Sequence, residues 1–124
     1  MTEPDFKFVS IIDDDQSIQS ALKDLMEAAG FSPVCFGSAE EFLESDHRNK
    51  TACLVVDIRM PGMSGLELQA KLKGEEPWIP IIFITAHGDA KMRLQAMKAG
   101  AVAFLPKPFD DEVLVEMVRV ALKG

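Results

Sequence analysis

The residues ACLVVD (52–57), followed by IRMPGMSG (58–65), are the stretch from which the fold can be deduced. Apart from its last residue, ACLVVD is apolar, without the alternation of a strand that has one face in water. Such a run is typical of a parallel strand that helices cover on both faces. Asp57 ends the run, and the next segment contains Pro61, Gly62 and Gly65, which allow tight turns beside a ligand. We therefore expect a central strand with a functional loop directly after it.

Further strands alternate with helices on both sides of this stretch. Apolar runs predict strands over residues 6–12, 33–36, 80–86 and 102–106 in addition to 52–57. Helical spacing of apolar residues fills the segments between them and the segment after the last one. This alternation predicts an α/β fold, a single doubly wound five-stranded parallel sheet with five helices. Pro106 cannot donate to a neighbouring strand, so the last strand is expected at an edge.

Polar residues mark where the helices begin, and glycines mark where they end. The expected N-caps are Asp15, Ser38, Ser64, Asp89 and Asp110, of which Ser38 and Ser64 are each followed three positions later by a Glu, as in a capping box. The expected stops are Gly30, Gly74 and Gly100. In the last helix the residues expected to face the sheet are Val113, Leu114, Met117, Val118 and Ala121. The polar stretch SDHRNK (45–50) is expected to be a solvated loop, with His47 in water.

Composition restricts the class of protein. A chain of 124 residues, 48% of them hydrophobic, predicts one domain with a real core. No apolar run is long enough to span a membrane, and MTEPDFK at the start does not resemble a signal peptide, so we expect a cytoplasmic protein. The net charge of -7 argues against direct nucleic-acid binding by this chain. Cys35 and Cys53 lie singly in apolar surroundings, which predicts buried thiols.

The polar residues at the strand ends select a site. In open parallel sheets, ligands bind beyond the carboxyl ends of the strands. Asp13 and Asp14 follow the first strand, Asp57 ends the third, Thr85 ends the fourth and Lys107 follows the fifth. All of them are expected to meet at one edge of the sheet.

The residue types in this set point to phosphoryl chemistry. Carboxylate oxygens are the ligands that Mg²⁺ prefers, and Mn²⁺ can take the same kind of site. A carboxylate beside a bound cation can attack a phosphoryl group, because the cation offsets the repulsion between the two anions. The ammonium of Lys107 and the hydroxyl of Thr85 supply partners for the phosphoryl oxygens. The repulsion within the triple run Asp13 to Asp15 is expected to be offset by such a cation, by a helix N-terminus or by exposure to water.

These segments resemble a response-regulator receiver domain of two-component signalling. The resemblance rests on the acidic pair after VSII, on VVDIRMPGMSG, on FITA and on FLPKPF, in this order and at these spacings, and it covers essentially the whole chain. The segments HGD, AMKAGA and KPF most resemble the FixJ-like branch of transcription factors. The resemblance implies a flavodoxin-like strand order, 2-1-3-4-5.

The resemblance also implies a role for each site residue. Asp57 matches the Asp that accepts phosphate from a sensor histidine kinase. Asp13 and Asp14 match the pair that holds Mg²⁺, with Asp14 as the direct ligand and Asp15 left as a helix cap, and the backbone carbonyl of Arg59 would join them. Thr85 and Phe104 match a switch pair and Lys107 the phosphate-binding Lys, and the Lys107–Pro108 bond is expected to be cis. The side chains of Arg59 and His87 occupy positions that tune the phosphorylation lifetime in the family.

The resulting hypothesis is a phosphoacceptor signalling domain over residues 1–124, not an enzyme with turnover, without an output domain in this chain. Phosphorylation is expected to drive homodimerisation through the fourth helix, fifth strand and fifth helix, and to control transcription. Two alternatives remain open. A Mg²⁺-dependent phosphohydrolase of the haloacid-dehalogenase type also uses an aspartyl nucleophile. That family places its nucleophile after the first strand and usually has a longer chain. A receiver that binds partners without phosphate would need no chemistry at Asp57.

Overall fold

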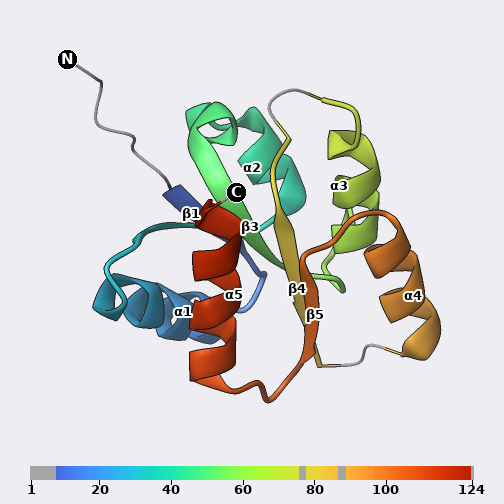
Figure 1. Ribbon diagram of the computed structural model, residues 1–124. Coiled ribbons are helices and arrows are strands. Elements are labelled where there is room, and N and C mark those ends of the chain that lie inside the picture. The colour runs from blue at the N-terminus through green and yellow to red at the C-terminus, as the bar shows by residue number, and fades with distance from the viewer. Residues whose placement is uncertain (1–7, 76–77, 87–88, 124) are drawn as a thin grey trace.

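A computed structural model describes residues 8–75, 78–86 and 89–123. Five parallel strands form one sheet in the order β2-β1-β3-β4-β5, which confirms the expected fold and strand order (Figure 1). The strands are β1 (Phe8–Ile12), β2 (Ser32–Phe36), β3 (Thr51–Asp57), β4 (Ile81–Thr85) and β5 (Ala103–Pro106). The strand that carries Pro106 lies at an edge, as its missing N–H predicts.

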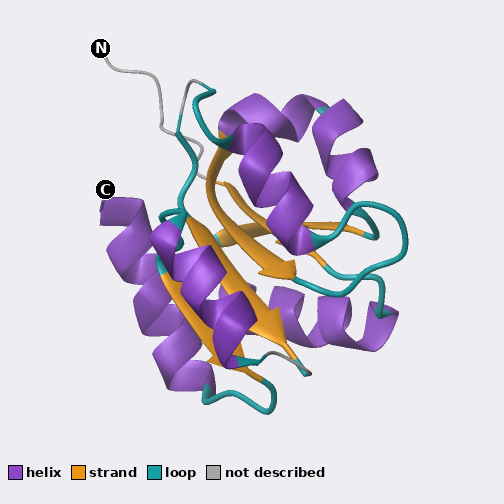
Figure 2. Ribbon diagram, turned by 90° about the vertical axis from the view of Figure 1, so that its right-hand side faces the viewer, coloured by secondary structure: helices purple, strands orange, loops and turns teal. Residues whose placement is uncertain are grey.

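The helices follow the strands in turn and cover both faces of the sheet (Figure 2). They are α1 (Gln16–Ala28), α2 (Ala39–Glu44), α3 (Gly65–Leu72), α4 (Ala90–Lys98) and α5 (Asp111–Lys123), with a short 3₁₀ helix, η1 (Asp46–Lys50), before β3. Within the described residues, no helix is long and apolar enough to cross a lipid bilayer.

Strand β3 is buried except at Ala52, because the core divides into two clusters, one on each face of the sheet. Val55 packs with residues of α1 and α5, whereas its neighbour Val56 packs with residues of α2, α3 and α4. Successive side chains of a strand point to opposite faces, so a strand between two helical layers must be apolar throughout. This is the physical reason that ACLVVD lacks alternation, and it places Asp57 at the centre of the sheet edge.

The helix starts follow the predicted caps. The side chains of Asp15, Ser38, Ser64 and Asp89 each accept a backbone N–H from the first turn of α1, α2, α3 and α4 respectively. Ser64 and Glu67 form a complete capping box. Asp110 accepts the N–H of Glu112 at 2.8 Å, so it begins α5. The predicted stops Gly30, Gly74 and Gly100 all have positive φ, which costs glycine little.

Three expectations from the sequence are wrong. Cys53 is buried as predicted, but Cys35 is only half-buried. In α5, Leu114, Val118 and Ala121 are buried but Val113 is 44% exposed, because a residue next to Leu114 points about 100° away around a helix of 3.6 residues per turn. The stretch after Ser45 forms η1 rather than a loop, and His47 is half-buried, with its ring centroid 5.1 Å from that of Phe8. The aromatic contact holds this polar turn against the end of β1.

Candidate functional site

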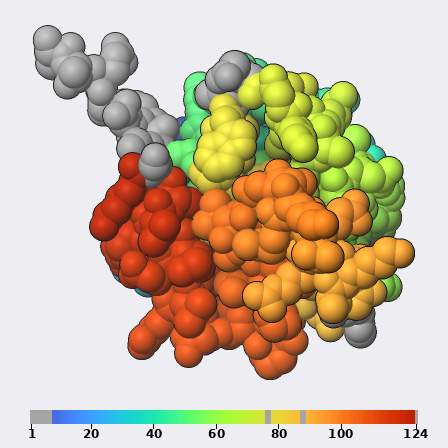
Figure 3. All heavy atoms as spheres, turned by 45° about the vertical axis from the view of Figure 1, so that its right-hand side comes forward, coloured from blue at the N-terminus to red at the C-terminus, as the bar shows by residue number. Residues whose placement is uncertain are grey.

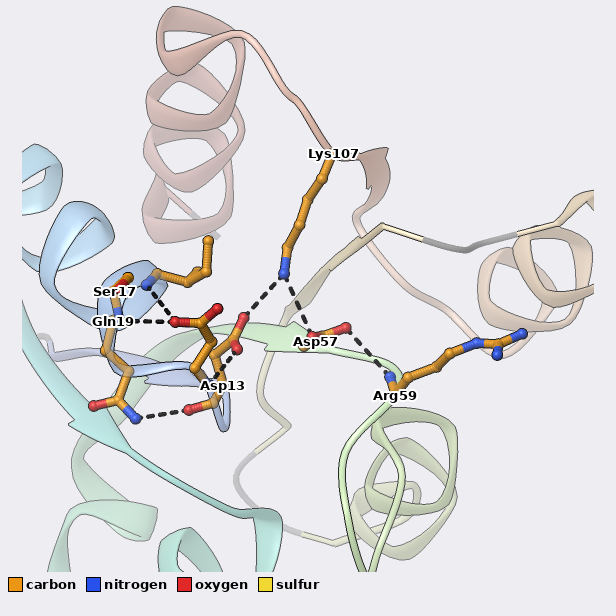
Figure 4. Close-up of polar contacts among 8 residues, drawn as sticks. Asp13, Ser17, Gln19, Asp57, Arg59 and Lys107 are labelled. Carbon is orange, nitrogen blue, oxygen red and sulfur yellow. Dashed lines mark hydrogen bonds and ion pairs between the residues drawn. The ribbon is translucent and has the colours of Figure 1, made fainter.

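The carboxyl ends of the strands bring the predicted residues together. β1 pairs with β3 so that Ile12 lies beside Val56, which makes Asp13 and Asp57 neighbours at the sheet edge. Lys107 follows β5, and its side chain extends back across the ends of β4 and β3 (Figure 4). Residues far apart in the sequence thus form one polar cluster because all five strands run in the same direction.

Asp13 is buried, and hydrogen bonds fix both its side chain and its backbone. Its Oδ1 accepts the N–H of Asp15 at 2.9 Å, and its backbone oxygen accepts a hydrogen bond from Gln19 Nε2 at 2.7 Å (Figure 4). Burial raises the pKa of Asp13, against the opposing effects of the Asp15 N–H and the Lys107 charge. An ionised group in this place is costly unless a cation lies beside it.

Lys107 provides that positive charge. Its Nζ lies 3.2 Å from Oδ2 of Asp13 and 3.4 Å from Oδ2 of Asp57. Burial alone would lower the pKa of Lys107, but the two negative charges outweigh it and raise the pKa above its ordinary value. The backbone N–H of Lys107 also donates to the carbonyl of Thr85 at 2.8 Å, which fixes the ends of β4 and β5 to each other. The Lys107–Pro108 bond is cis, as expected.

Asp57 lies where the loop after β3 turns closely around it. Its Oδ1 accepts the backbone N–H of Arg59 at 3.2 Å, and the N–H of Gly65 donates to the carbonyl of Ile58 at 2.9 Å. A Cβ on Gly65 would lie 2.7 Å from the backbone oxygen of Asp57, so only glycine allows α3 to begin this close to the acid. Oδ2 of Asp57 faces the ammonium group, and the residue as a whole is buried.

Three carboxylates are placed to hold a cation. Asp13, Asp14 and Asp57 each offer an oxygen, and these atoms lie within 4.8 Å of one another, with Asp14 exposed and the other two buried. An all-oxygen set of acids with one side open to water suits Mg²⁺, which keeps several of its waters when bound. Asp15 is used as the cap of α1 instead, as the sequence indicated. The side chain of Arg59 extends away from the acids, which leaves its backbone as the part directed at the site (Figure 4).

Thr85 and Phe104 lie on the neighbouring strands β4 and β5. Thr85 is buried at the end of β4, and Phe104 is half-buried on β5 with its ring centroid 6.5 Å from that of Phe83. A cavity of about 240 Å³ opens beside the Phe104 ring, lined also by Asp89, Ala90, Arg93 and Pro106. His87 lies outside the described residues.

Two residues of the site were not predicted. Gln19 holds the β1–α1 connection through the carbonyl of Asp13, and Glu40 on α2 accepts the N–H of Met63 in the loop after Asp57 at 2.9 Å. Neither stands at a strand end, which was the signal used to select site residues. The only trace of Gln19 in the sequence is its position one turn after the N-cap Asp15.

Comparison with known proteins gives one consistent family. The family model described as "Response regulator receiver domain" matches residues 9–119. The response regulator protein TodT of Pseudomonas putida is 48% identical over 115 residues, which are 93% of this chain and 51% of that protein. The transcriptional regulatory protein FixJ of Bradyrhizobium diazoefficiens is 39% identical over 115 residues, 93% of this chain and 56% of that protein. The chain therefore spans about half the length of these relatives.

Solved structures agree with the sequence comparison. A structure of FixJ-N has a TM-score of 0.85 at 39% identity and covers 100% of this chain and 97% of that one. A structure of the response regulator StyR has a TM-score of 0.84 at 46% identity and covers 94% of this chain and 59% of that one. The similarity extends over the whole sheet and its helices.

Proposed function

Because the chain belongs to the response regulator receiver domain family of two-component systems, we propose that Asp57 accepts a phosphoryl group from a sensor histidine kinase. The observation that carries the proposal is the position of Lys107, whose ammonium lies between Asp13 and Asp57. The ammonium group of Lys107 contacts both Asp13, a candidate metal ligand, and Asp57, the candidate nucleophile. It is therefore placed to bind an incoming phosphoryl oxygen.

The transfer uses a carboxylate oxygen of Asp57 as the nucleophile. A new bond forms between that oxygen and phosphorus, the bond between phosphorus and the donor nitrogen breaks, and its electron pair stays on the imidazole of the kinase. The N–H of Arg59 holds Oδ1 of Asp57, and Lys107 faces Oδ2. These two contacts orient the carboxylate before the donor arrives, which lowers the entropy cost of the reaction.

Asp13, Asp14, Asp57 and the backbone carbonyl of Arg59 would hold Mg²⁺, or Mn²⁺ in its place. The bound cation offsets the negative charge that otherwise repels a phosphoryl donor from three acids. Asp13 and Asp57 would contribute from buried positions and Asp14 from the open side. The charge of a divalent cation also compensates the burial of Asp13, so binding should stabilise the fold.

We propose that the phosphorylated state is read through Thr85 and Phe104. The Thr85 hydroxyl would move to a phosphoryl oxygen, and Phe104 would rotate into the space that it leaves. The bond from the Lys107 N–H to the Thr85 carbonyl ties these movements to the group that binds phosphate. Moving a population from about 1:99 to 99:1 needs about 5.5 kcal/mol of differential stabilisation, which several charge-assisted hydrogen bonds to phosphate can supply.

The output is proposed to be a homodimer formed through α4, β5 and α5, which lie side by side on one face (Figure 3). Leu94 and Met97 on α4 are 56% and 40% exposed, so this face carries apolar area that a second copy would bury. α4 also carries the exposed basic residues Lys91, Arg93 and Lys98.

Transcription is the proposed output because the relatives include FixJ, a transcriptional regulatory protein. We propose that residues 1–124 act as a receiver domain. The side chains of Arg59 and His87 are proposed to tune the rate. The charge of -7 supports an indirect role without nucleic-acid contact by this chain. A phosphohydrolase of the haloacid-dehalogenase type carries its nucleophile after the first strand, whereas here the loop after β3 turns closely around Asp57, which favours a phosphoacceptor.

Incubation with Mg²⁺ and acetyl phosphate, followed by mass spectrometry of peptides, tests the proposal. We expect the mass of one phosphoryl group on Asp57 and none on an Asp57→Asn variant. Label on Asp13 would support the phosphohydrolase alternative, as would steady release of phosphate over many turnovers. No label on a folded wild type would support a receiver that works without phosphate.

A further inference from the structure

Glu40 connects α2 to the loop that follows Asp57. It lies in the first turn of α2, and its Oε2 accepts the backbone N–H of Met63 at 2.9 Å across 23 residues of sequence. Glu40 is exposed to water and the Met63 N–H lowers its pKa, so the side chain is ionised at neutral pH. The contact is therefore a charge-assisted hydrogen bond from one element to another.

The loop is shaped around this carboxylate. Gly62 has φ of +77°, and a Cβ added there would lie 2.6 Å from Oε2 of Glu40. The carboxylate thus fills the space in which a side chain at this position would lie. The positive φ of Gly62 favours glycine, and a side chain there would displace the Glu40 carboxylate from its present position.

Arg59, the proposed carbonyl ligand, stands between the two fixed ends of this loop. At the base, the N–H of Gly65 donates to the Ile58 carbonyl and the N–H of Arg59 donates to Asp57. At the tip, Met63 is bound to Glu40. A loop that is hydrogen-bonded only at its base would allow the peptide group after Arg59 to rotate. The additional hydrogen bond, at the tip of the loop, limits that rotation.

We propose that Glu40 is a positioning residue that fixes the direction of the Arg59 carbonyl toward the cation. The inference rests on the proposed function, because it assumes that this carbonyl is a metal ligand. Mg²⁺ requires nearly ideal octahedral geometry, so its affinity is sensitive to a ligand that can rotate. Met60 and Met63 also pack against the core and hold part of the loop, so the effect of Glu40 is partial.

The test compares Mg²⁺ binding to the wild type, Glu40→Ala and Glu40→Gln by isothermal titration calorimetry. Gln keeps an oxygen that can accept the Met63 N–H, so we expect affinity within about twofold of the wild type. For Glu40→Ala we expect affinity about fivefold to tenfold weaker, at the low end of the effect of residues that orient metal ligands. Glu44→Ala, at the other end of α2, is the control for loss of one exposed negative charge.

Hydrogen exchange of the Met63 amide checks the cause. Exchange should become faster in Glu40→Ala and remain slow in Glu40→Gln. The initial rate of phosphorylation by acetyl phosphate should need more Mg²⁺ in Glu40→Ala but reach the wild-type value at saturation. A lower maximal rate with an unchanged Mg²⁺ requirement would contradict positioning of the ligand.

The outcomes separate the two proposals. If the wild type fails to bind Mg²⁺, the proposed function is wrong, and this inference with it. If the wild type binds Mg²⁺ and Glu40→Ala binds as tightly, only the role of Glu40 is wrong. Equal weakening by Glu40→Gln and Glu40→Ala would mean that charge, not the hydrogen bond to Met63, is responsible, and would also refute it.

Discussion

The Nζ of Lys107 lies 3.2 Å from Oδ2 of Asp13, so an ion pair joins the residue after β5 to the residue after β1. Two strands, β3 and β4, lie between them in the sheet. The pair therefore closes over the strand ends and holds Asp57 beneath the same ammonium group. A change at any one of these three residues alters the charge balance of the other two.

Replacing Asp13 with Asn should raise the stability of the fold without Mg²⁺ and weaken cation binding. Burial raises the pKa of Asp13, so the stability that this residue contributes is present below about pH 4 and is lost as the pH rises through the raised value. Asn keeps an acceptor for the Asp15 N–H without the charge. Without Mg²⁺ at pH 7, Asp13→Asn should therefore have a higher free energy of unfolding than the wild type.

Urea denaturation with and without Mg²⁺ measures both effects. At a Mg²⁺ concentration one hundred times its dissociation constant, the wild type should gain about 2.7 kcal/mol and Asp13→Asn much less. An equal gain in both proteins would mean that Asp13 does not hold the cation.

Replacing Asp14 with Ala should affect Mg²⁺ binding, whereas replacing Asp15 with Ala should affect the stability of the fold. Asp14 belongs to the carboxylate group, so Asp14→Ala should weaken Mg²⁺ binding by about tenfold or more. Asp15 caps α1, so Asp15→Ala should cost about 1 kcal/mol of stability and leave Mg²⁺ affinity within about twofold. Calorimetric titration and thermal unfolding of both variants check this. Equal Mg²⁺ affinities would show that the register of the acidic run is wrong.

Replacing Lys107 with Met should uncouple phosphorylation from its consequence. The proposed nucleophile Asp57 remains, so uptake of phosphate from acetyl phosphate should fall by less than about tenfold. Without the ammonium, the phosphoryl group loses a charge-assisted partner of about 1.5–3 kcal/mol, and dimerisation should fail. Phosphate incorporation and sedimentation velocity are measured on the same sample. A Lys107→Met protein that takes up phosphate and dimerises like the wild type would refute the coupling.

Replacing Thr85 with Ala should prevent the dimer that activation produces. We expect a monomer when the wild type is unmodified and a dimer when it is phosphorylated or treated with a beryllium fluoride complex. Thr85→Ala lacks the hydroxyl that would bind the phosphoryl oxygen, so it should stay monomeric, whereas Thr85→Ser keeps the hydroxyl and should dimerise. Sedimentation equilibrium of the three proteins is the measurement.

Two results would oppose this account. An activated wild type that remains monomeric would remove the dimer as the output. A Thr85→Ala variant that dimerises as readily as Thr85→Ser would remove the link between Thr85 and Phe104.

The Cys53 thiol should make stability fall at high pH. Burial raises the pKa of Cys53 to about 12, above the ordinary value of about 8.5 for an unfolded chain. Its contribution to the free energy of unfolding is therefore present below about pH 8.5 and is lost toward pH 12, by about 1.4 kcal/mol per pH unit. The difference between the wild type and Cys53→Ala, from urea denaturation at pH 7.5 to 10.5, should decrease accordingly. Cys35 is present in both proteins and cancels.

The fold was predictable because its signals are local. Apolar runs such as ACLVVD, and caps such as Asp15 and Ser64, specify strands and helix starts within a few residues of themselves. Positive φ at Gly30 follows equally from its place after a helix. The prediction from the sequence was wrong where a contact between residues far apart in the chain decides the structure. At His47 that contact is with the ring of Phe8. Val113 was placed inward because helical spacing does not show which stripe of α5 faces the sheet.

The sequence by itself determined which residues form the candidate site, because parallel strands must end at one edge and Asp13, Asp57, Thr85 and Lys107 each stand at a strand end. Only the tertiary structure decided how they interact: that Lys107 pairs with both Asp13 and Asp57, and that Glu40 holds the loop after β3. Order along the chain fixes secondary structure and strand direction through local hydrogen bonds and hydrophobic periodicity. Distances between side chains of different strands depend on packing across the whole sheet, which no local pattern records.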